Sequence, residues 1–170
     1  MIVVIMGVTG VGKTTVGKLL AARCAMRFYD ADDYHPAANI EKLRAGIPLQ
    51  DSDRWPWLDR LNALLREAEA GKQSAVLACS ALKKSYRERL NVGCDDVRYV
   101  LLTGEKELIR QRLSARKGHY MNPALLDSQL ETLQTPTECI SLHIADTPEA
   151  LVERIIAATQ WANPCRSEPQ

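Results

Sequence analysis

The residues with the most recognisable chemistry form one glycine-rich segment, Gly7-Val8-Thr9-Gly10-Val11-Gly12-Lys13-Thr14, with Thr15 directly after it. The segment fits the pattern G-x-x-x-x-G-K-[ST] and lies between an apolar run and a helical pattern, as this motif requires. Glycines let successive N–H groups point at one anion, and a helix amino terminus adds the positive end of its dipole. We predict an ATP-phosphate cradle in which Lys13 reaches the β- and γ-phosphates and Thr14 ligates Mg²⁺. The alternative is a glycine-rich turn that binds nothing.

Acidic residues follow the second apolar run, at Asp30, Asp32 and Asp33. In an extended segment Asp30 and Asp32 would point the same way, because one residue separates them. One is expected to hold Mg²⁺ through water, with Asp30 as the candidate, and another to accept the proton of a substrate hydroxyl. Which of the three acids has which role stays open, and a solvated acidic turn or a helix cap is the alternative.

Basic residues are expected on the far side of the transferred phosphoryl group. Arg112 and Arg116 lie one helical turn apart and lead into Lys117-Gly118-His119. A loop that carries cations and closes over ATP would expel water and neutralise the developing charge. The alternative is a solvated basic helix end, which the helix dipole also favours.

Other classes of nucleotide-binding protein fit less well. No NKxD-type segment for reading guanine is present, which argues against a GTPase. The apolar run Ala75–Cys79 continues as Ser80-Ala81, without the acid that motor and ring ATPases place there to hold the metal. The acids after the second run instead favour a kinase that acts on a small molecule.

Short apolar runs alternate with longer helical patterns, which predicts a parallel sheet flanked by helices. Strands are expected at Ile2–Met6, Arg27–Asp30, Ala75–Cys79, Val97–Thr103 and Ser141–Ala145. Helices are expected at Thr14–Met26, Pro36–Ala45, Ser52–Ala70 with Ser52 as the cap, Leu82–Leu90, Lys106–Arg116 and Ala124–Leu133, followed by one that Thr147 and Pro148 open. We expect one domain over residues 1–161, a mobile lid at about 116–135, and a frayed tail over 162–170.

Composition and chain length limit the number of domains, the classes of partner and the cellular compartment. A chain of 170 residues suits one domain, and a net charge of +1 gives no indication of nucleic-acid or membrane binding. Five irregularly spaced cysteines without a CxxC pair argue against zinc and favour reduced thiols in the cytoplasm. The opening run Met1–Met6 is too short to span a bilayer.

Several segments taken together closely resemble the gluconokinase family. They are Asp30–Asn39, Ile40–Leu49, Asp51–Leu58, Cys79–Arg87, Arg116–Met121 and Leu125–Gln129, which with the glycine-rich segment cover the chain to about Pro136. The resemblance implies ATP-dependent phosphorylation of D-gluconate at its terminal hydroxyl, giving 6-phosphogluconate. It also implies a P-loop NTPase fold like that of the nucleoside monophosphate kinases, and a homodimer.

The layout is similar, more distantly, to that of shikimate kinase, and this likeness implies roles by position. Asp32 becomes the substrate-facing acid, Arg54 the clamp for a carboxylate, and Arg116 with Lys117 the lid cations. Arg suits that clamp because its planar fork binds a carboxylate through two hydrogen bonds. The expected catalytic residues are therefore Lys13, Asp32 and Arg116.

The remaining polar candidates would meet the hydroxyls of the sugar acid: His35, Asn39, Ser80 and Lys83. For His35 and Asn39, formation of a turn and a cap is an equal alternative. His119 is a candidate phosphate contact or a solvated loop histidine. Trp55 and Trp57 are expected to pack the start of the long helix rather than to stack on sugar.

Some positions depart from the pattern of the family: Leu43, Gln50, Tyr120 and Gln134. None removes a cation or an acid from the expected site, so they bear on the choice of sugar acid and not on the class of enzyme. The rival predictions are a kinase for another small hydroxy acid or nucleotide, and an ATP-binding regulatory switch.

Overall fold

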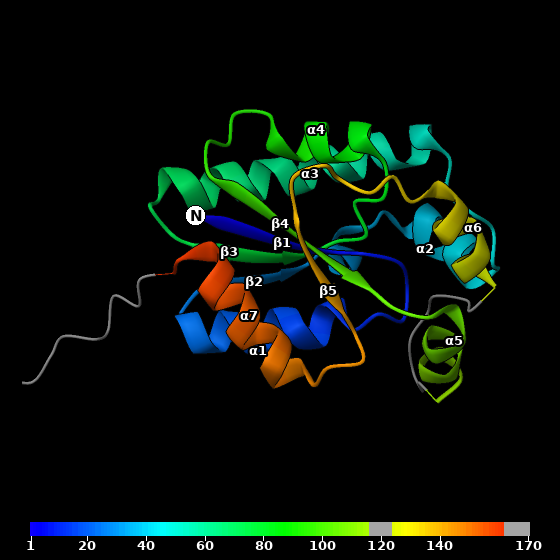
Figure 1. The fold of residues 1–170 in the computed structure, drawn as a ribbon. Coiled ribbons are helices and arrows are strands. Elements are labelled where there is room, and N and C mark those ends of the chain that lie inside the picture. Colours follow the sequence, from blue (N-terminus) through cyan, green and yellow to red (C-terminus); the bar gives the residue numbers. More distant parts are fainter. Residues whose placement is uncertain (116–123, 162–170) are drawn as a thin grey trace, which may run out of the picture.

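The computed structural model describes residues 1–115 and 124–161, and its centre is a parallel sheet (Figure 1). The strands are β1 (Ile2–Met6), β2 (Arg27–Asp30), β3 (Ala75–Ala78), β4 (Val97–Thr103) and β5 (Ile140–His143). Their order across the sheet is β2-β3-β1-β4-β5, and each neighbouring pair is parallel. The carboxyl ends of the strands therefore meet at one edge of the sheet, and the predicted α/β class is confirmed.

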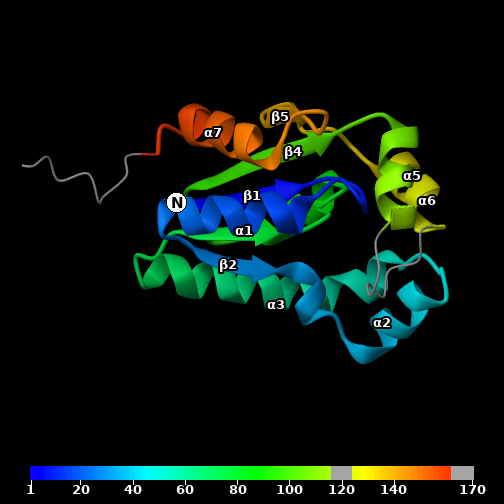
Figure 2. The ribbon, with the colours of Figure 1, turned by 90° about the horizontal axis from the view of Figure 1, so that it is seen from below.

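Helices cover both faces of this sheet and one of its ends. They are α1 (Lys13–Cys24), α2 (Ala37–Arg44), α3 (Asp51–Ala70), α4 (Lys84–Asn91), α5 (Lys106–Ala115), α6 (Leu125–Thr132) and α7 (Pro148–Thr159). Figure 1 shows α1 and α7 on one face and α3 and α4 on the other. The helices α2, α5 and α6 gather at the end toward which the strands point (Figure 2).

The two faces of β1 contribute to two separate cores, because side chains alternate along a strand. Val3 and Ile5 pack in the core with α1 and α7, whereas Ile2, Val4 and Met6 pack in the core with α3 and α4. All five β1 residues are buried, which explains why this strand is an uninterrupted apolar run rather than an alternating one.

Two helix starts can be compared with the sequence-based predictions. At α7, Thr147 Oγ1 accepts a hydrogen bond from Ala150 N at 3.3 Å and Pro148 is the first helical residue, so that prediction is confirmed. At α3, the prediction of Ser52 as the cap was wrong. The helix begins at Asp51, and the Asp53 carboxylate accepts from Gln50 N at 2.9 Å, because a carboxylate in the first turn can reach back to the free N–H there.

Part of the predicted lid and the predicted tail lie outside the described residues, at 116–123 and 162–170. Within the described ranges, no helix combines the length and the apolar character that a membrane crossing needs. The cysteines of these ranges, Cys24, Cys79, Cys94 and Cys139, are free thiols.

Candidate active site

A cavity of about 380 Å³ lies where β1, β2 and β3 end. The glycine-rich loop between β1 and α1 forms one wall, and the acids after β2, Ser80 after β3 and Arg54 of α3 form the rest. The lining includes these residues predicted from sequence: Thr9, Gly10, Val11, Gly12, Lys13, Thr14, Thr15, Asp30, Asp32, His35, Arg54, Ser80 and Arg112. The fold thus brings the predicted phosphate cradle and most of the predicted acceptor residues to one hollow.

The backbone of the glycine-rich loop has a shape that side chains would prevent. Gly7 has a φ of 135°, and a Cβ atom there would lie 2.6 Å from Leu102 O. Gly12 has a φ of 95° and immediately precedes α1, so the helix amino terminus faces the loop. Gly7 and Val8 do not line the cavity, but Val8 O accepts a hydrogen bond from Lys13 Nζ at 2.9 Å. This hydrogen bond therefore holds the Lys13 ammonium group against the glycine-rich loop.

The side-chain oxygens of Thr14 and Asp30 lie next to each other beside this loop. Thr14 Oγ1 donates to Asp30 Oδ2 at 2.8 Å. Among the described residues no cluster of three His, Cys, Asp or Glu side chains could hold a metal. A hydroxyl with one carboxylate fits Mg²⁺, which keeps several waters and shares phosphate oxygens rather than requiring a cage made only of protein.

The backbone after β2 differs from the prediction, which took Asp30 and Asp32 to lie in one extended segment. Residues Ala31–Tyr34 instead form a short 3₁₀ helix, here called η1. Asp30 Oδ1 accepts from Asp32 N at 3.1 Å, so the Asp30 carboxylate caps η1 and stabilises the turn against an extended chain. Asp30 and Asp32 both line the cavity, whereas Asp33 is exposed and does not.

His35 and Trp57 form an aromatic wall on the acceptor side. Their rings stack with centroids 4.2 Å apart and planes 14° apart. Burial lowers the pKa of His35 to about 4, with Asp32 opposing the shift and Arg54 adding to it, so the imidazole is neutral at pH 7. Trp57 Nε1 donates to Ala31 O at 2.8 Å, which anchors the start of α3 against η1, as the packing interpretation of this tryptophan predicts.

Arg54 lies between this cavity and a smaller one of about 160 Å³. Its guanidinium group donates to Leu49 O and lies 5.3 Å from the centre of the Tyr86 ring. Lys83 lines only the smaller cavity, where its Nζ lies 2.7 Å from Asp51 Oδ1. Hydrogen bonds from Lys83 and then Tyr86 hold the pKa of Asp51 below its usual value. The structure therefore places Lys83 beside the main cavity rather than in it.

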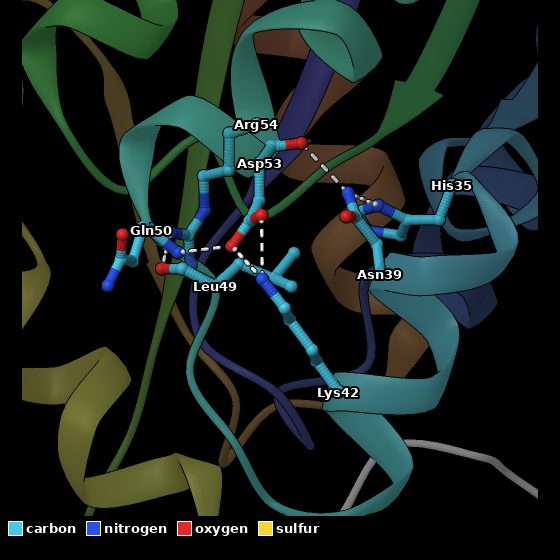
Figure 3. A network of polar contacts seen from close by, with 7 residues as sticks. All are labelled: His35, Asn39, Lys42, Leu49, Gln50, Asp53 and Arg54. Atoms are coloured by element: carbon cyan, nitrogen blue, oxygen red, sulfur yellow. Dashed lines mark hydrogen bonds and ion pairs between the residues drawn. The ribbon is translucent and has the colours of Figure 1, made fainter.

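Asn39 also lies outside the main cavity. The side chain is buried on α2, and its Nδ2 donates to Asp53 O at 2.9 Å and approaches His35 Nδ1 at 3.5 Å (Figure 3). Asn39 thus joins α2 to the first turn of α3 through Asp53 O, in agreement with the alternative that a residue of this type organises a turn or a helix start.

The far end of the cavity is formed by Arg112 of α5 with Asp146, Pro148 and Leu151 near the start of α7. Arg112 donates to Ile144 O at 2.8 Å, which ties α5 to the segment after β5. The other predicted cations, Arg116 and Lys117, and also His119, lie outside the described residues.

Sequence reasoning missed Gln129 as a site residue. Its Oε1 accepts a hydrogen bond from Thr9 N, in the glycine-rich loop, at 2.7 Å, and its side chain lines both cavities. The two residues are separated by 120 positions, so no local pattern reveals the contact. The one available signal was the position of Gln129 at the end of a segment, Leu125–Gln129, that resembles a kinase family.

Comparison with known proteins gives consistent results. A family model described as an AAA domain matches residues 3–134. A probable gluconokinase of Dictyostelium discoideum is 43% identical over 168 residues, which cover 91% of this chain and 84% of the relative.

Solved structures agree with these matches. A sugar kinase from Janibacter sp. HTCC2649 is 41% identical with a TM-score of 0.90 and covers 95% of each chain. A gluconokinase from Sinorhizobium meliloti 1021 is 37% identical with a TM-score of 0.82, over 93% of this chain and 90% of that one. A shikimate kinase from Aquifex aeolicus, at 18% identity and a TM-score of 0.58, is similar in fold alone.

A phosphate cradle, an acid pair after β2 and an arginine of α3 share one cavity, and relatives well above 30% identity match most of the chain. The chain belongs to the gluconokinase family of P-loop kinases.

Proposed function

We propose that this chain transfers the γ-phosphoryl group of Mg²⁺-bound ATP to the terminal hydroxyl of D-gluconate and releases ADP and 6-phospho-D-gluconate. The observation that carries the proposal is that the phosphate cradle, Asp32 and Arg54 line one cavity. The names of the family relatives supply the acceptor, because the proteins matched over most of their length are gluconokinases.

The nucleotide end of the reaction is assigned to the loop and α1. Backbone N–H groups of residues 10–15 would surround the phosphates beside Thr9, and Lys13 would neutralise charge on the β- and γ-phosphates. Thr14 and Asp30 would hold Mg²⁺, which supplies charge neutralisation on the transferring group. Arg112, and Arg116 from the part of the chain that is not described, would complete the ATP site.

The acceptor end is assigned to the opposite wall. Arg54 would bind the carboxylate of gluconate, and Asp32 would accept the proton of the attacking terminal hydroxyl as its oxygen bonds to phosphorus. His35 and Ser80 would contact other hydroxyls, and Lys83 would contact a hydroxyl from the adjoining cavity. Phosphoryl transfer has a loose transition state, so these residues act mainly by alignment and charge.

Acceptor specificity tests the proposal directly. The purified chain is incubated with Mg·ATP and, separately, with gluconate, shikimate, other sugar acids and nucleoside monophosphates, while ADP release is followed. Gluconate should give the highest kcat/KM. Proton-coupled ³¹P NMR should show the product phosphorus coupled to two protons, as a triplet or a doublet of doublets, because a terminal CH₂–O–P group carries two protons, whereas phosphorylation of a secondary hydroxyl gives a doublet.

Each rival assignment has its own outcome in the same assay. Turnover with another acid and none with gluconate would reassign the acceptor but keep the phosphate cradle. Slow ATP hydrolysis that no metabolite accelerates would favour a regulatory switch. A doublet with gluconate would mean that the chain phosphorylates a different hydroxyl.

Three expectations about the whole protein complete the proposal. Residues 1–161 form one kinase domain with a lid at about 116–135, the chain works as a homodimer, and it resides in the cytoplasm. The free thiols of the described residues are consistent with a reducing compartment. Light scattering of the purified protein should give twice the chain mass of 18.9 kDa.

A further inference from the structure

The His35 ring is held on its face by Trp57. The two rings are nearly parallel, and Trp57 is itself fixed by the hydrogen bond from its Nε1 to Ala31 O. Stacking determines the plane of an imidazole, but it permits two orientations related by a half-turn about the Cβ–Cγ bond. A second contact is needed to decide which edge of the ring carries Nδ1.

Asn39 supplies that contact, and its own orientation is determined by Asp53 (Figure 3). The Asn39 atom 2.9 Å from Asp53 O must be the amide nitrogen, because a backbone carbonyl oxygen only accepts hydrogen bonds. The same nitrogen lies 3.5 Å from His35 Nδ1. An NH₂ group has no acceptor site, so Nδ1 must offer its lone pair, and the proton of a neutral His35 must be on Nε2.

The surroundings favour a neutral ring and a rigid amide. Burial, with a smaller contribution from Arg54 of α3, lowers the pKa of His35 to about 4, while Asp32 opposes the shift. Asn39 is only 4% exposed. Asp53, whose carbonyl orients Asn39, is fixed in turn by its carboxylate, which pairs with Lys42 Nζ at 2.8 Å and caps α3 at Gln50 N.

We propose that Asn39 is a positioning residue that fixes His35 as the tautomer protonated on Nε2, so that His35 offers the acceptor substrate a hydrogen-bond donor. His35 lines the main cavity beside Asp32 and Arg54, whereas Asn39 does not line it. The ligand group that this donor recognises is an oxygen with a lone pair, either a hydroxyl or a carboxylate. The inference rests on the proposed function only where it takes the acceptor to be a polyhydroxy acid.

The tautomer can be observed without any substitution. Long-range ¹H–¹⁵N spectra of ¹⁵N-labelled protein at neutral pH distinguish protonated from unprotonated ring nitrogens. The chain has three histidines, and the His35 signals are those lost in His35→Phe. We expect Nε2 protonated and Nδ1 unprotonated. A His35 protonated on Nδ1, or on both nitrogens, would overturn the inference.

The role of Asn39 is tested by Asn39→Asp, which keeps the size of the side chain but replaces the donor with an acceptor. The proton of the neutral His35 ring should move from Nε2 to Nδ1, which removes the donor, so the KM for gluconate should rise about 3- to 10-fold, the value of one hydrogen bond, with the KM for ATP unchanged. The matched control is Asn62→Asp. Asn62 is another buried asparagine, whose Nδ2 donates to Leu90 O and Val92 O, both at 2.8 Å, away from the cavity. The control should leave the His35 spectrum and the KM for gluconate unchanged.

A pair of substitutions at His35 keeps the test decisive if Asn39→Asp does not fold. His35→Phe retains an aromatic ring against Trp57 but has no donor, whereas His35→Gln restores an N–H donor. The KM for gluconate should rise more in His35→Phe than in His35→Gln. Equal values in the two variants would overturn the donor role, as would an Asn39→Asp protein with an unprotonated Nδ1 and an unchanged KM.

Failure of the proposed function would be seen separately. If the wild-type protein does not phosphorylate gluconate, that function falls, and the NMR spectrum still decides the tautomer. The KM comparisons are then made with the acceptor that ADP release identifies.

Discussion

Arg54 is the charged residue among the described residues that line both cavities of the site. Its guanidinium group contacts Leu49 O and the face of Tyr86, and it lies on the same helix as the two carboxylates Asp51 and Asp53. A planar cation in this place can bind a carboxylate through two parallel hydrogen bonds. The acceptor side of the proposed reaction therefore depends more on Arg54 than on any other described cation of α3.

Replacing Arg54 with alanine is expected to affect the acceptor much more than the nucleotide. Loss of a charge-assisted contact corresponds to a rise in the KM for gluconate of about 10- to 100-fold, with the KM for ATP changed by less than about threefold. Steady-state kinetics with each substrate varied in turn measure both. Arg60→Ala, an exposed arginine of the same helix whose guanidinium lies over Tyr34, is the control and should change neither value. Equal rises for the two substrates would move Arg54 out of the acceptor site.

Gln129 is expected to influence the transfer step, because it contacts the phosphate cradle and lines both cavities. Gln129→Met keeps the length of the side chain but leaves Thr9 N without this acceptor. One lost hydrogen bond predicts a kcat lower by roughly 2- to 10-fold. The ratio of ATP hydrolysed to gluconate phosphorylated should also rise, since the γ-phosphoryl group is aligned less well with its acceptor.

A second glutamine provides the matched control for this substitution. Gln134 Oε1 accepts from Lys84 N at 2.8 Å, and Gln134 lines neither cavity. Gln134→Met should leave kcat and the hydrolysis ratio unchanged. Identical kinetics for both variants and the wild type would show that the Gln129 contact has no part in catalysis.

The sequence predicted the residues of the site unevenly, for a physical reason. The cradle could be predicted locally, because Gly7–Gly12 form a continuous loop directly before α1 and its glycines allow the backbone angles that the loop needs. Gln129 could not be predicted as a site residue, because its contact with Thr9 depends on how α6 is placed beside the loop. For Asn39 the sequence left substrate contact and formation of a turn or cap as equal alternatives, because a polar side chain on a short helix does not reveal that it is buried beside Asp53.

At the scale of elements, the contacts that stabilise the first turn of α3 also fix the position of Arg54, because Arg54 directly follows Asp53. Asp53 caps the helix at Gln50 N and pairs with Lys42 of α2. The Lys42 hydrogen bond first, and the Gln50 N–H second, lower the pKa of the Asp53 carboxyl. A carboxyl whose folded-state pKa is depressed stabilises the fold at pH values above its unfolded pKa, and this stabilisation is lost as the pH falls through the folded value.

Asp53→Asn should therefore lower the melting temperature at neutral pH, and the difference from wild type should shrink in acid. Urea or thermal unfolding between about pH 7 and about pH 3.5, which spans the titration of aspartate, measures this. Ser52→Ala is the control at the adjacent position, where the side chain is exposed. If the two substitutions have the same effect at neutral pH, Asp53 is not the cap. A difference that is constant with pH would exclude its charge as the cause.

The bounds of three strands were predicted, whereas the start of one helix and one short turn were not. The strands β1, β2 and β4 have the predicted bounds, Ile2–Met6, Arg27–Asp30 and Val97–Thr103, although only β1 is buried throughout. The start of α3 was misplaced because several residues near it can cap a helix, and local sequence does not rank Ser52 against Gln50 and Asp53. The 3₁₀ turn at Ala31–Tyr34 was missed because it depends on one side-chain contact, from Asp32 N to the Asp30 carboxylate.

At the scale of the whole molecule, the order β2-β3-β1-β4-β5 places β1 at the centre of the sheet, with β3 and β4 as its neighbours. The cradle therefore projects from the most constrained strand, whose five residues are all buried. The alternation of strand and helix patterns predicted the parallel sheet, because parallel strands need crossover helices. It did not predict the order of the strands, which depends on how α1, α3 and α7 divide between the two faces.

Because the cradle joins β1, α1 and the acids after β2, nucleotide binding should stabilise the whole fold. A ligand at 100 times its Kd adds about 2.7 kcal/mol to the free energy of unfolding. For a chain of this size that corresponds to a rise in melting temperature of about 5–10 °C. We expect this rise with Mg²⁺ and a non-hydrolysable ATP analogue, and a much smaller one when EDTA removes the metal that Thr14 and Asp30 are proposed to hold.

Lys13→Met should fold with a melting temperature near that of the wild type, because Lys13 Nζ donates to Val8 O of the loop and Lys13 belongs to neither hydrophobic core. It should nevertheless lose most of the rise that the nucleotide produces, together with turnover. Lys18→Met is the control, since Lys18 lies on the same helix but is exposed and outside the cavity. A full nucleotide-induced rise in Lys13→Met would mean that the triphosphate binds elsewhere, and the cradle at the end of β1 would then not be the ATP site.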